Sequence, residues 1–108
     1  MSKIQSINPY TGEVLKEFDP LSPREMEAIQ VEADKAFSNW KNTNFSSRAK
    51  LMKSAADELL KNKEHYARLI SLEMGKVIRE SRSEIEKCAW VCEFYAEKGE
   101  EFLSTEKI

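Results

Sequence analysis

The stretch from Ser71 to Leu103 constrains the fold most, because an expected chain reversal is followed by one long amphipathic segment. The reversal is Ser71-Leu-Glu-Met-Gly-Lys76. After it, apolar or small residues recur at alternating steps of three and four, which is the period of an α-helix: Ile78, Ser81, Ile85, Cys88, Cys92, Tyr95, Gly99 and Phe102. At about 1.5 Å per residue this helix is roughly 40 Å long. A face of that length must be covered, and the three earlier helical segments of this chain can cover part of it.

The N-terminal residues favour a β-hairpin. Two short β-prone runs between Ile4 and Phe18 flank the segment Asn8-Pro-Tyr-Thr-Gly12. Asn, Pro and Gly within five residues are typical of a turn, because proline fixes φ and glycine supplies a positive φ. Two strands alone are marginally stable in water, so we expect this hairpin to need a further surface.

Three helices are predicted between the hairpin and the reversal. Ser22 is the expected N-cap of the first, with Pro23 at the first helical position and Glu25 completing a capping box. Ser46 or Ser47 is expected to cap the second helix, Asn62 to end it in a left-handed conformation, and Gly75 to end a third that begins near Lys63. The predicted inner faces are Met26, Ile29, Ala33, Ala36, Phe37 and Trp40; Leu51, Met52, Ala55, Ala56, Leu59 and Leu60; and Tyr66, Leu69, Ile70 and Met74.

Composition excludes several classes of function. Charged residues make up 33% of the 108 residues, yet the two signs are mixed and the net charge is −2. Without a basic run, binding to nucleic acid is not expected. No window approaches the 18 apolar residues of a membrane span, and the N-terminus is not an apolar signal core. Two cysteines within one helix form no disulfide framework, so we expect a cytoplasmic location.

The predicted fold class is therefore mainly α: an N-terminal β-hairpin (residues 1–18) and a helical region (22–104) of four helices, the last one long. No internal repeat, low-complexity run or linker suggests a second domain. We interpret residues 1–108 as a single domain.

Several short motifs, in order, resemble the NAD(P)-dependent aldehyde dehydrogenase superfamily. The first is Ser6-Ile-Asn-Pro-Tyr-Thr-Gly-Glu13, similar to the N-terminal hairpin of these enzymes. Glu73-Met-Gly-Lys76 is similar to the succinate-semialdehyde dehydrogenase-like branch. Val77 departs from the proline that is common in the family at the head of the long helix. Between these motifs the resemblance rests on Ala36, Phe37, Trp40, Arg48, Leu51 and Leu69, with Glu80 after them.

The resemblance implies that residues 1–108 are a single, incomplete domain: the opening part of the α/β Rossmann-like cofactor domain of a much longer enzyme, whose remainder would cover the apolar helix faces. That parent enzyme would oxidise an aldehyde to a carboxylic acid through a cysteine thioester, with NAD or NADP as cofactor. The motifs that carry this chemistry in the family are absent from the sequence, and three glycines at positions 12, 75 and 99 build no Gly-x-Gly phosphate cradle. We therefore predict no catalytic, cofactor-binding or metal-binding residue in this chain, and no activity for the chain alone.

Cys88 and Cys92 lie one helical turn apart and could share a metal ion. Two thiols do not complete a tetrahedral zinc site, and neighbouring Glu84 and Glu86 disfavour a reactive thiolate. We interpret both cysteines as small buried hydrophobes.

Other residues that suggest chemistry have a structural interpretation as well. His65 is expected on the surface, and Glu80, Glu84 and Lys87 fit a salt-bridged outer helix face better than an acid–base pair. The segment from Glu73 to Lys76 fits a stabilised chain reversal better than a ligand contact. Core positions, and not a stacking platform, are predicted for four aromatic residues: Trp40, Trp90, Phe94 and Tyr95.

Two functions are compatible with these observations. In the first, the chain is the N-terminal scaffold of an aldehyde dehydrogenase, and the remainder of that enzyme is its partner. In the second, it is a free-standing helical module that binds itself or another protein. In either case the uncovered apolar faces predict self-association of the isolated chain as a dimer or higher oligomer.

Overall fold

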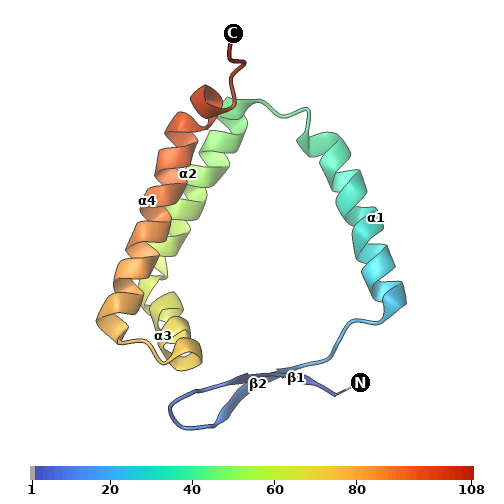
Figure 1. Ribbon diagram of the computed structural model, residues 1–108. Helices are drawn as coiled ribbons and strands as arrows, with labels where there is room; N and C mark the ends of the chain where they lie inside the picture. The colour runs from blue at the N-terminus through green and yellow to red at the C-terminus, as the bar shows by residue number, and fades with distance from the viewer. Residues whose placement is uncertain (1) are drawn as a thin grey trace. The chain divides into compact units, whose positions relative to one another are not determined.

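The computed structural model describes residues 2–108, which form two strands and four helices (Figure 1). The elements follow in chain order as β1 (Ile4–Ile7), β2 (Val14–Phe18), α1 (Pro23–Trp40), α2 (Phe45–Lys61), α3 (Lys63–Met74) and α4 (Ile78–Phe102). The mainly helical fold with an N-terminal hairpin agrees with the prediction. Contacts divide the chain into two compact units, Met1–Thr43 and Asn44–Ile108.

The first unit contains the predicted hairpin. Strands β1 and β2 pair antiparallel, with Ile4 opposite Phe18 and a bulge at Ser6/Ile7. The turn is closed by Asn8, whose carbonyl oxygen accepts a hydrogen bond from the Gly12 amide at 2.8 Å. Its side chain also accepts from the Tyr10 amide at 2.9 Å. Gly12 has a φ of 75°, which explains why glycine stands at this position.

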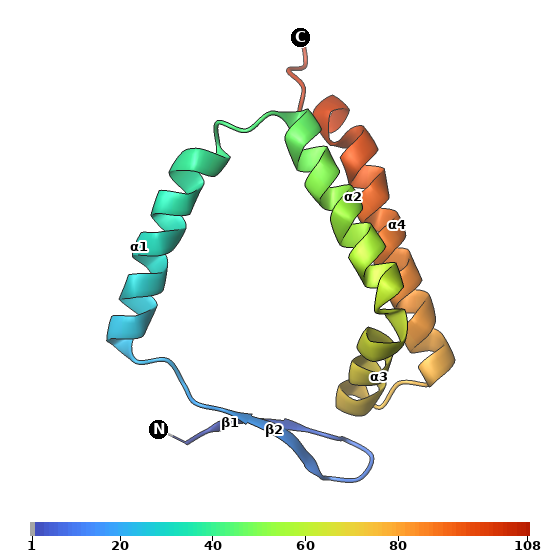
Figure 2. The same cartoon turned by 180° about the vertical axis from the view of Figure 1, so that it is seen from behind.

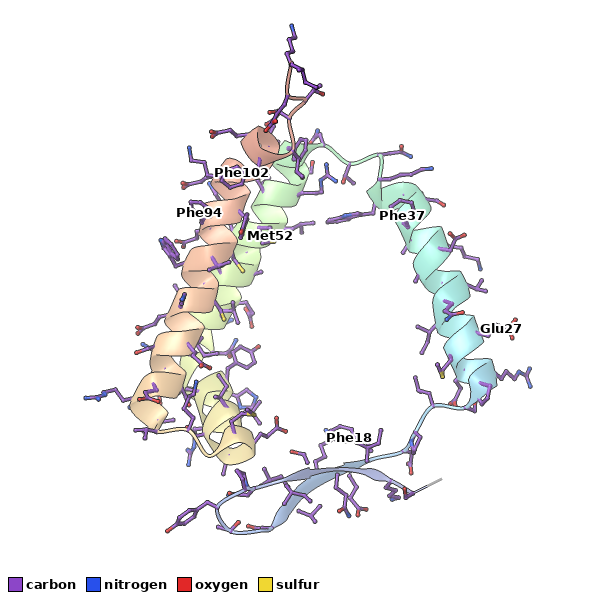
Figure 3. The ribbon with its side chains drawn as sticks, in the orientation of Figure 1. Phe18, Glu27, Phe37, Met52, Phe94 and Phe102 are labelled. Atoms are coloured by element: carbon purple, nitrogen blue, oxygen red, sulfur yellow. The ribbon has the colours of Figure 1, made fainter. Side chains whose placement is uncertain are left out.

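The start of α1 agrees with the sequence in detail. The Ser22 hydroxyl accepts a hydrogen bond from the Glu25 amide, and the Glu25 carboxylate accepts from the Ser22 amide at 2.8 Å, with Pro23 at the first helical position. This is the predicted capping box. The predicted apolar face of α1 is formed but not buried: α1 has no buried residue, and Ile29 is 53% exposed. Phe37 also lies exposed on α1 (Figure 3).

The second unit is built around the contact between α2 and α4, which lie side by side in both views (Figures 1 and 2). Helix α3 packs against α4 as well. The buried residues of this unit are nearly all small. Small side chains let helix backbones approach closely, so a short chain can still exclude water from this contact. The buried residues are Ala56 on α2, Ala67 on α3, and Ser81, Ile85 and Ala89 on α4.

The buried stripe of α4 departs from the predicted one in its second half. Ser81 and Ile85 are buried as expected, but Ala89 is buried in place of Cys88, and Ala96 is more covered than Tyr95. The prediction used a strict 3.5-residue repeat. A straight α-helix has 3.6 residues per turn, so its buried face drifts from such a repeat by only about 20° per heptad, which is a fifth of one position. Instead, the buried line continues from Ser81 and Ile85 with a further step of four to Ala89.

The inner faces of α2 and α3 were predicted too broadly. On α2, Ala56 is buried and Met52 and Leu59 are half-buried, but Leu51, Ala55 and Leu60 are exposed. On α3, Ala67 is fully buried. Tyr66 and Ile70 are half-buried there, whereas Leu69 and Met74 are exposed. Each of these helices therefore buries a narrow line of residues.

Two predicted helix ends were wrong. Asn44 caps α2, because its side chain accepts from the Ser47 amide at 2.8 Å, so Ser46 and Ser47 lie inside the helix. Asn62 is not left-handed: its φ is −104°, and its side chain donates to the Glu58 carbonyl oxygen at 3.1 Å. Gly75 does adopt the predicted left-handed conformation, with a φ of 68°.

Candidate functional site

The reversal between α3 and α4 is held by side chains from both helices. The hydroxyls of Ser71 and Ser81 lie 2.8 Å apart, and Ser81 is fully buried. Lys76, which precedes α4, forms an ion pair with Glu84 in the second turn of this helix. Val77 precedes α4 and offers no side-chain cap to it. These contacts support the interpretation of the segment as a stabilised chain reversal.

Ion pairs also join α3 to the outer face of α4. The Arg82 guanidinium donates two hydrogen bonds to the Glu64 carboxylate, at 2.7 and 3.0 Å. These bonds lower the pKa of Glu64 below its usual value and raise that of Arg82. Lys63 pairs with Glu86 at 2.9 Å. This face of α4 is thus salt-bridged. Glu84 takes part through Lys76, but the predicted pairing among Glu80, Glu84 and Lys87 is not found in the described residues.

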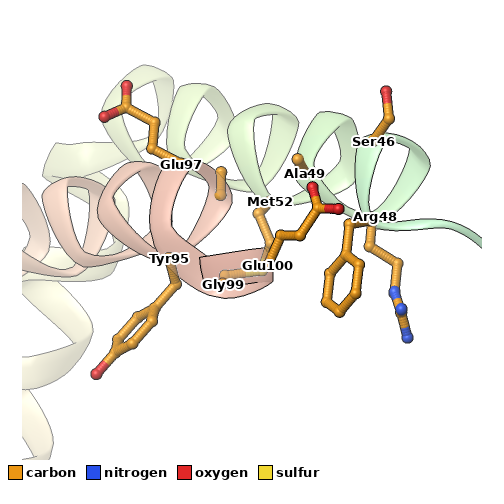
Figure 4. A pocket seen from close by; sticks show the side chains of 10 residues that line it. Ser46, Arg48, Ala49, Met52, Tyr95, Glu97, Gly99 and Glu100 are labelled. Carbon is orange, nitrogen blue, oxygen red and sulfur yellow. The ribbon is translucent and has the colours of Figure 1, made fainter. Parts of the chain in front are cut away.

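A groove of about 230 Å³ lies between the N-terminal half of α2 and the C-terminal half of α4. Arg48 and Phe45 come from α2, and Tyr95, Glu97 and Glu100 from α4. Glu100 extends from α4 toward α2, whereas Tyr95 and Glu97 point to different sides of α4 (Figure 4). The groove floor includes small residues of the helix contact, among them Ala49, Ala96 and Gly99.

The groove has the chemistry of a polar contact surface. Arg48 lies over the Phe45 ring at 4.7 Å from its centroid, which fixes the guanidinium by a cation–π interaction. The lining of the groove has two carboxylates, a phenol and the Ser46 hydroxyl, but neither a cysteine nor a histidine. Ser46 forms no hydrogen bond with either carboxylate in the described residues, so a nucleophile paired with a base, as covalent catalysis requires, is not assembled here. The prediction that this chain holds no catalytic or cofactor-binding residue stays a prediction.

An aromatic row on α4 was missed as a surface feature. Trp90 stacks on Phe94 at 5.8 Å between centroids, and Phe94 also lies 5.9 Å from Phe102. Tyr95 lies 5.3 Å from Phe94. Phe94 and Phe102 are both visible on α4 (Figure 3). We name Trp90, Phe94, Tyr95 and Phe102 the aromatic row.

The predicted core positions of these aromatic residues were wrong for this chain. Trp90 is 59% exposed, Tyr95 and Trp40 are exposed too, and Phe94 is half-buried. The reason is angular: the buried stripe runs through Ala89 and Ala96, so the residues next to them face away from α2. Adjacent helical positions are separated by about 100° around the axis.

The two cysteines differ from their prediction as well. Cys88 is exposed and Cys92 half-buried, so Cys88 is not a buried hydrophobe. Within residues 2–108 no group of three or more His, Cys, Asp or Glu side chains is placed to hold a metal ion. His65 is exposed, as expected, and its ring lies 5.4 Å from that of Tyr66. None of the described helices has the length and apolar composition needed to cross a membrane.

Comparison with known proteins gives a consistent assignment over the whole sequence. Residues 1–108 match the aldehyde dehydrogenase family. Among curated relatives, succinate-semialdehyde dehydrogenase [NADP(+)] of Deinococcus radiodurans is 38% identical over 95% of this chain. A probable succinate-semialdehyde dehydrogenase [NADP(+)] of Synechocystis sp. is 38% identical over 97%.

A solved structure gives the same result. Succinic semialdehyde dehydrogenase from Streptococcus pyogenes, in complex with NADP+, has a TM-score of 0.85 and 29% identity over 95% of this chain. The chain spans only a small part of each relative: 22% and 23% of the two curated proteins and 24% of the solved chain. The matching part is the N-terminal one.

Proposed function

The chain belongs to the aldehyde dehydrogenase family, and from this membership we propose that it is the N-terminal scaffold of an enzyme that oxidises succinate semialdehyde with NADP. The activity belongs to the whole enzyme, and these 108 residues contribute structure to it and no reacting group. The aldehyde and the choice of NADP follow the names of the relatives. A cytoplasmic location remains a prediction from the sequence.

One observation carries this proposal. The relatives that match nearly the whole chain at 38% identity are named for one and the same activity. A shared segment of this length argues for a shared position in the parent fold. Because fold does not by itself imply function, the substrate is the part of the proposal that needs an experiment.

The exposed faces of the chain support a scaffold role. Ile29, Phe37 and Trp40 on α1 are about half exposed, as are Trp90 and Tyr95 of the aromatic row. Large apolar side chains gathered on helix faces are a feature of surfaces that other protein covers. In the proposed enzyme, that protein is the remainder of the dehydrogenase.

A chimera tests the proposal directly. This chain replaces the matching N-terminal segment of the Deinococcus radiodurans relative, and NADP reduction is followed with succinate semialdehyde as substrate. We expect turnover within about tenfold of the parent enzyme, and no turnover from the chain alone. A matched control carries the swap with Ile85→Ala, which disrupts the α2–α4 contact and should lower the yield of folded enzyme.

Two results would contradict the proposal. A soluble, folded chimera without activity would show that the chain cannot serve as this scaffold. Turnover by the isolated chain above the buffer rate, retained after removal of contaminating enzyme, would show that it holds reacting groups.

A second candidate function is favoured by the aromatic row alone. Four aromatic residues along one side of α4, three of them more than half exposed, form a surface on which a second copy could pack. Self-association of the isolated chain follows from the same exposed surface.

Light scattering on the isolated chain across micromolar concentrations distinguishes a monomer from a self-associated chain. We expect a dimer or larger species, and Trp90→Lys should return the chain to a monomer without loss of helix content. A wild-type monomer throughout that range would remove this candidate.

A further inference from the structure

Cys88 and Cys92 form a pair of thiols that the scaffold role does not use. They lie one turn apart on α4 and share an apolar strip of its surface with Glu84, Lys87 and Val91. Both are free, and Cys88 is exposed to solvent. Two thiols on successive turns of one helix face can both bind the same ligand.

We propose that Cys88 and Cys92 bind one soft, two-coordinate metal ion of the Cu(I) class. Thiolates are the ligands that Cu(I) prefers among protein side chains. The proposal goes beyond the scaffold function and concerns the chain by itself, in which Cys88 is exposed.

The spacing of the two residues suits two ligands and no more. Side chains at positions i and i+4 of a helix have Cβ atoms about 5–6 Å apart. A metal–sulfur bond is about 2.3 Å long, so a nearly linear sulfur–metal–sulfur unit spans about twice that distance. Rotation about the side-chain bonds of Cys88 and Cys92 brings the sulfurs to this separation without unwinding α4.

Other ions fit this pair poorly. Zinc in structural sites takes four ligands, and the described residues contain no group of three or more potential ligands. Calcium and magnesium take six or more oxygen ligands, including water. The apolar lining contributed by Val91 also favours an ion that needs few polar partners.

Binding conserves charge and atoms in a simple way. Each thiol gives its proton to solvent as its sulfur–copper bond forms, and no electron is transferred. The product, one Cu(I) with two thiolates, carries a net charge of −1. Lys87 on the same face of α4 places a cation near this anion, whereas the Glu84 carboxylate opposes it, so the two nearby charges balance each other.

The test is a titration of the reduced, full chain with Cu(I) without oxygen, in competition with a chromogenic Cu(I) chelator. We expect one ion per chain, with affinity at least about 100-fold above that of Cys88→Ser or Cys92→Ser, because the second thiol acts at a high effective concentration. Two protons should be released for each ion bound. Both substitutions are at exposed or half-buried positions, and circular dichroism checks that helix content is kept.

A matched control keeps two thiols but separates them. Cys92→Ser combined with Glu93→Cys places the second thiol about 140° around the helix from Cys88. Glu93→Ser alone controls for the lost carboxylate. We expect the displaced pair to bind no better than the single-cysteine variants. Equal affinity of the displaced pair, of a single-cysteine variant, or a ratio of one ion per two chains would overturn the proposal.

Discussion

The two units of the chain differ in how much of their order comes from packing. In the unit Asn44–Ile108, three helices share a buried line of small residues around Ile85. In the described part of the unit Met1–Thr43, no residue is buried. The hairpin and α1 are nevertheless formed, with a closed turn and a complete capping box. Local interactions can specify an element, but burial is what makes it cooperative.

The difference has a consequence for function. A unit with its own buried contact can hold its shape alone, whereas a capped helix with an exposed apolar face depends on what covers it. In the proposed dehydrogenase, α1 and the hairpin would gain most of their stability from the remainder of the enzyme. The unit Asn44–Ile108 would already be folded before the remainder of the enzyme packs against it.

The largest effect is expected from one substitution made in both units. Ile85 is 6% exposed and Ile29 is 53% exposed. Ile85→Ala should lower the free energy of unfolding by about 2–5 kcal/mol, the cost of a cavity in a packed contact. Ile29→Ala should change it by less than about 0.5 kcal/mol. Urea denaturation followed by circular dichroism measures both, and equal losses would erase the contrast between the units.

The two left-handed glycines come next. Gly75 and Gly12 have φ values of 68° and 75°, so a Cβ is unfavourable at either position by about 1–2 kcal/mol. Gly75→Ala should lower the unfolding midpoint of the helical unit, while Gly12→Ala should change only the hairpin signals in NMR spectra. Gly99, with nothing within 4 Å of an added Cβ, is the control: Gly99→Ala should raise stability by about 0.5–1 kcal/mol.

The helix caps allow a sharper test, because removing either cap side chain should destabilise its helix by about 1 kcal/mol. Ser22→Ala removes the capping box of α1, and Asn44→Ala removes the cap of α2. Asn44→Ala should shift the cooperative unfolding midpoint, because α2 is part of the packed unit. Ser22→Ala should instead reduce helicity at the start of α1, seen in its Cα chemical shifts. A shift of the midpoint by Ser22→Ala as large as that by Asn44→Ala would show that α1 unfolds with the packed unit.

The smallest effect is a dependence on pH. Hydrogen bonds from Arg82 lower the pKa of Glu64, so this carboxylate stabilises the fold above its unfolded pKa near 4.5 and loses that effect as the pH falls through the lower folded value. Hydrogen bonds from Ser22 likewise lower the pKa of Glu25. Glu64→Gln should flatten the fall in the unfolding midpoint below pH 4.5, and Glu25→Gln should leave it unchanged. A flatter pH dependence in Glu25→Gln, with an unchanged one in Glu64→Gln, would contradict this prediction, because the pH-sensitive contact would then lie in the unit of α1.

Much of the fold could be predicted because local chemistry determines it. The turn at Asn8–Gly12, the cap at Ser22 and the reversal at Gly75 depend on residues close together in the sequence, and all three are found. Asn44 was missed because Ser46 and Ser47 are equally good capping residues. Which of the three caps α2 depends on the residue at which the helix begins, and that is Phe45. The assignment to the aldehyde dehydrogenase family came from short motifs in order, and the comparisons confirm it.

The surface around α4 could not be predicted from periodicity. Ala89 and Cys88, or Ala96 and Tyr95, differ by one position, about 100° around the helix axis, and the period of the sequence does not decide which of the two faces α2. The predicted face followed alternating steps of three and four along the sequence, which selects Cys88 and Tyr95. In this chain the contact of α4 with α2 runs through the small residues, which leaves the aromatic row and Cys88 exposed.

Amide hydrogen exchange of α1, in the isolated chain and in the chimera with the Deinococcus radiodurans relative, tests the central claim most directly. The claim is that the exposed apolar faces of this chain are covered by the rest of a dehydrogenase. Amides of α1 should then exchange quickly in the isolated chain and at least about 100-fold more slowly in the chimera, while those around Ile85 are already protected in both. Equal exchange of α1 in the two proteins would contradict the account.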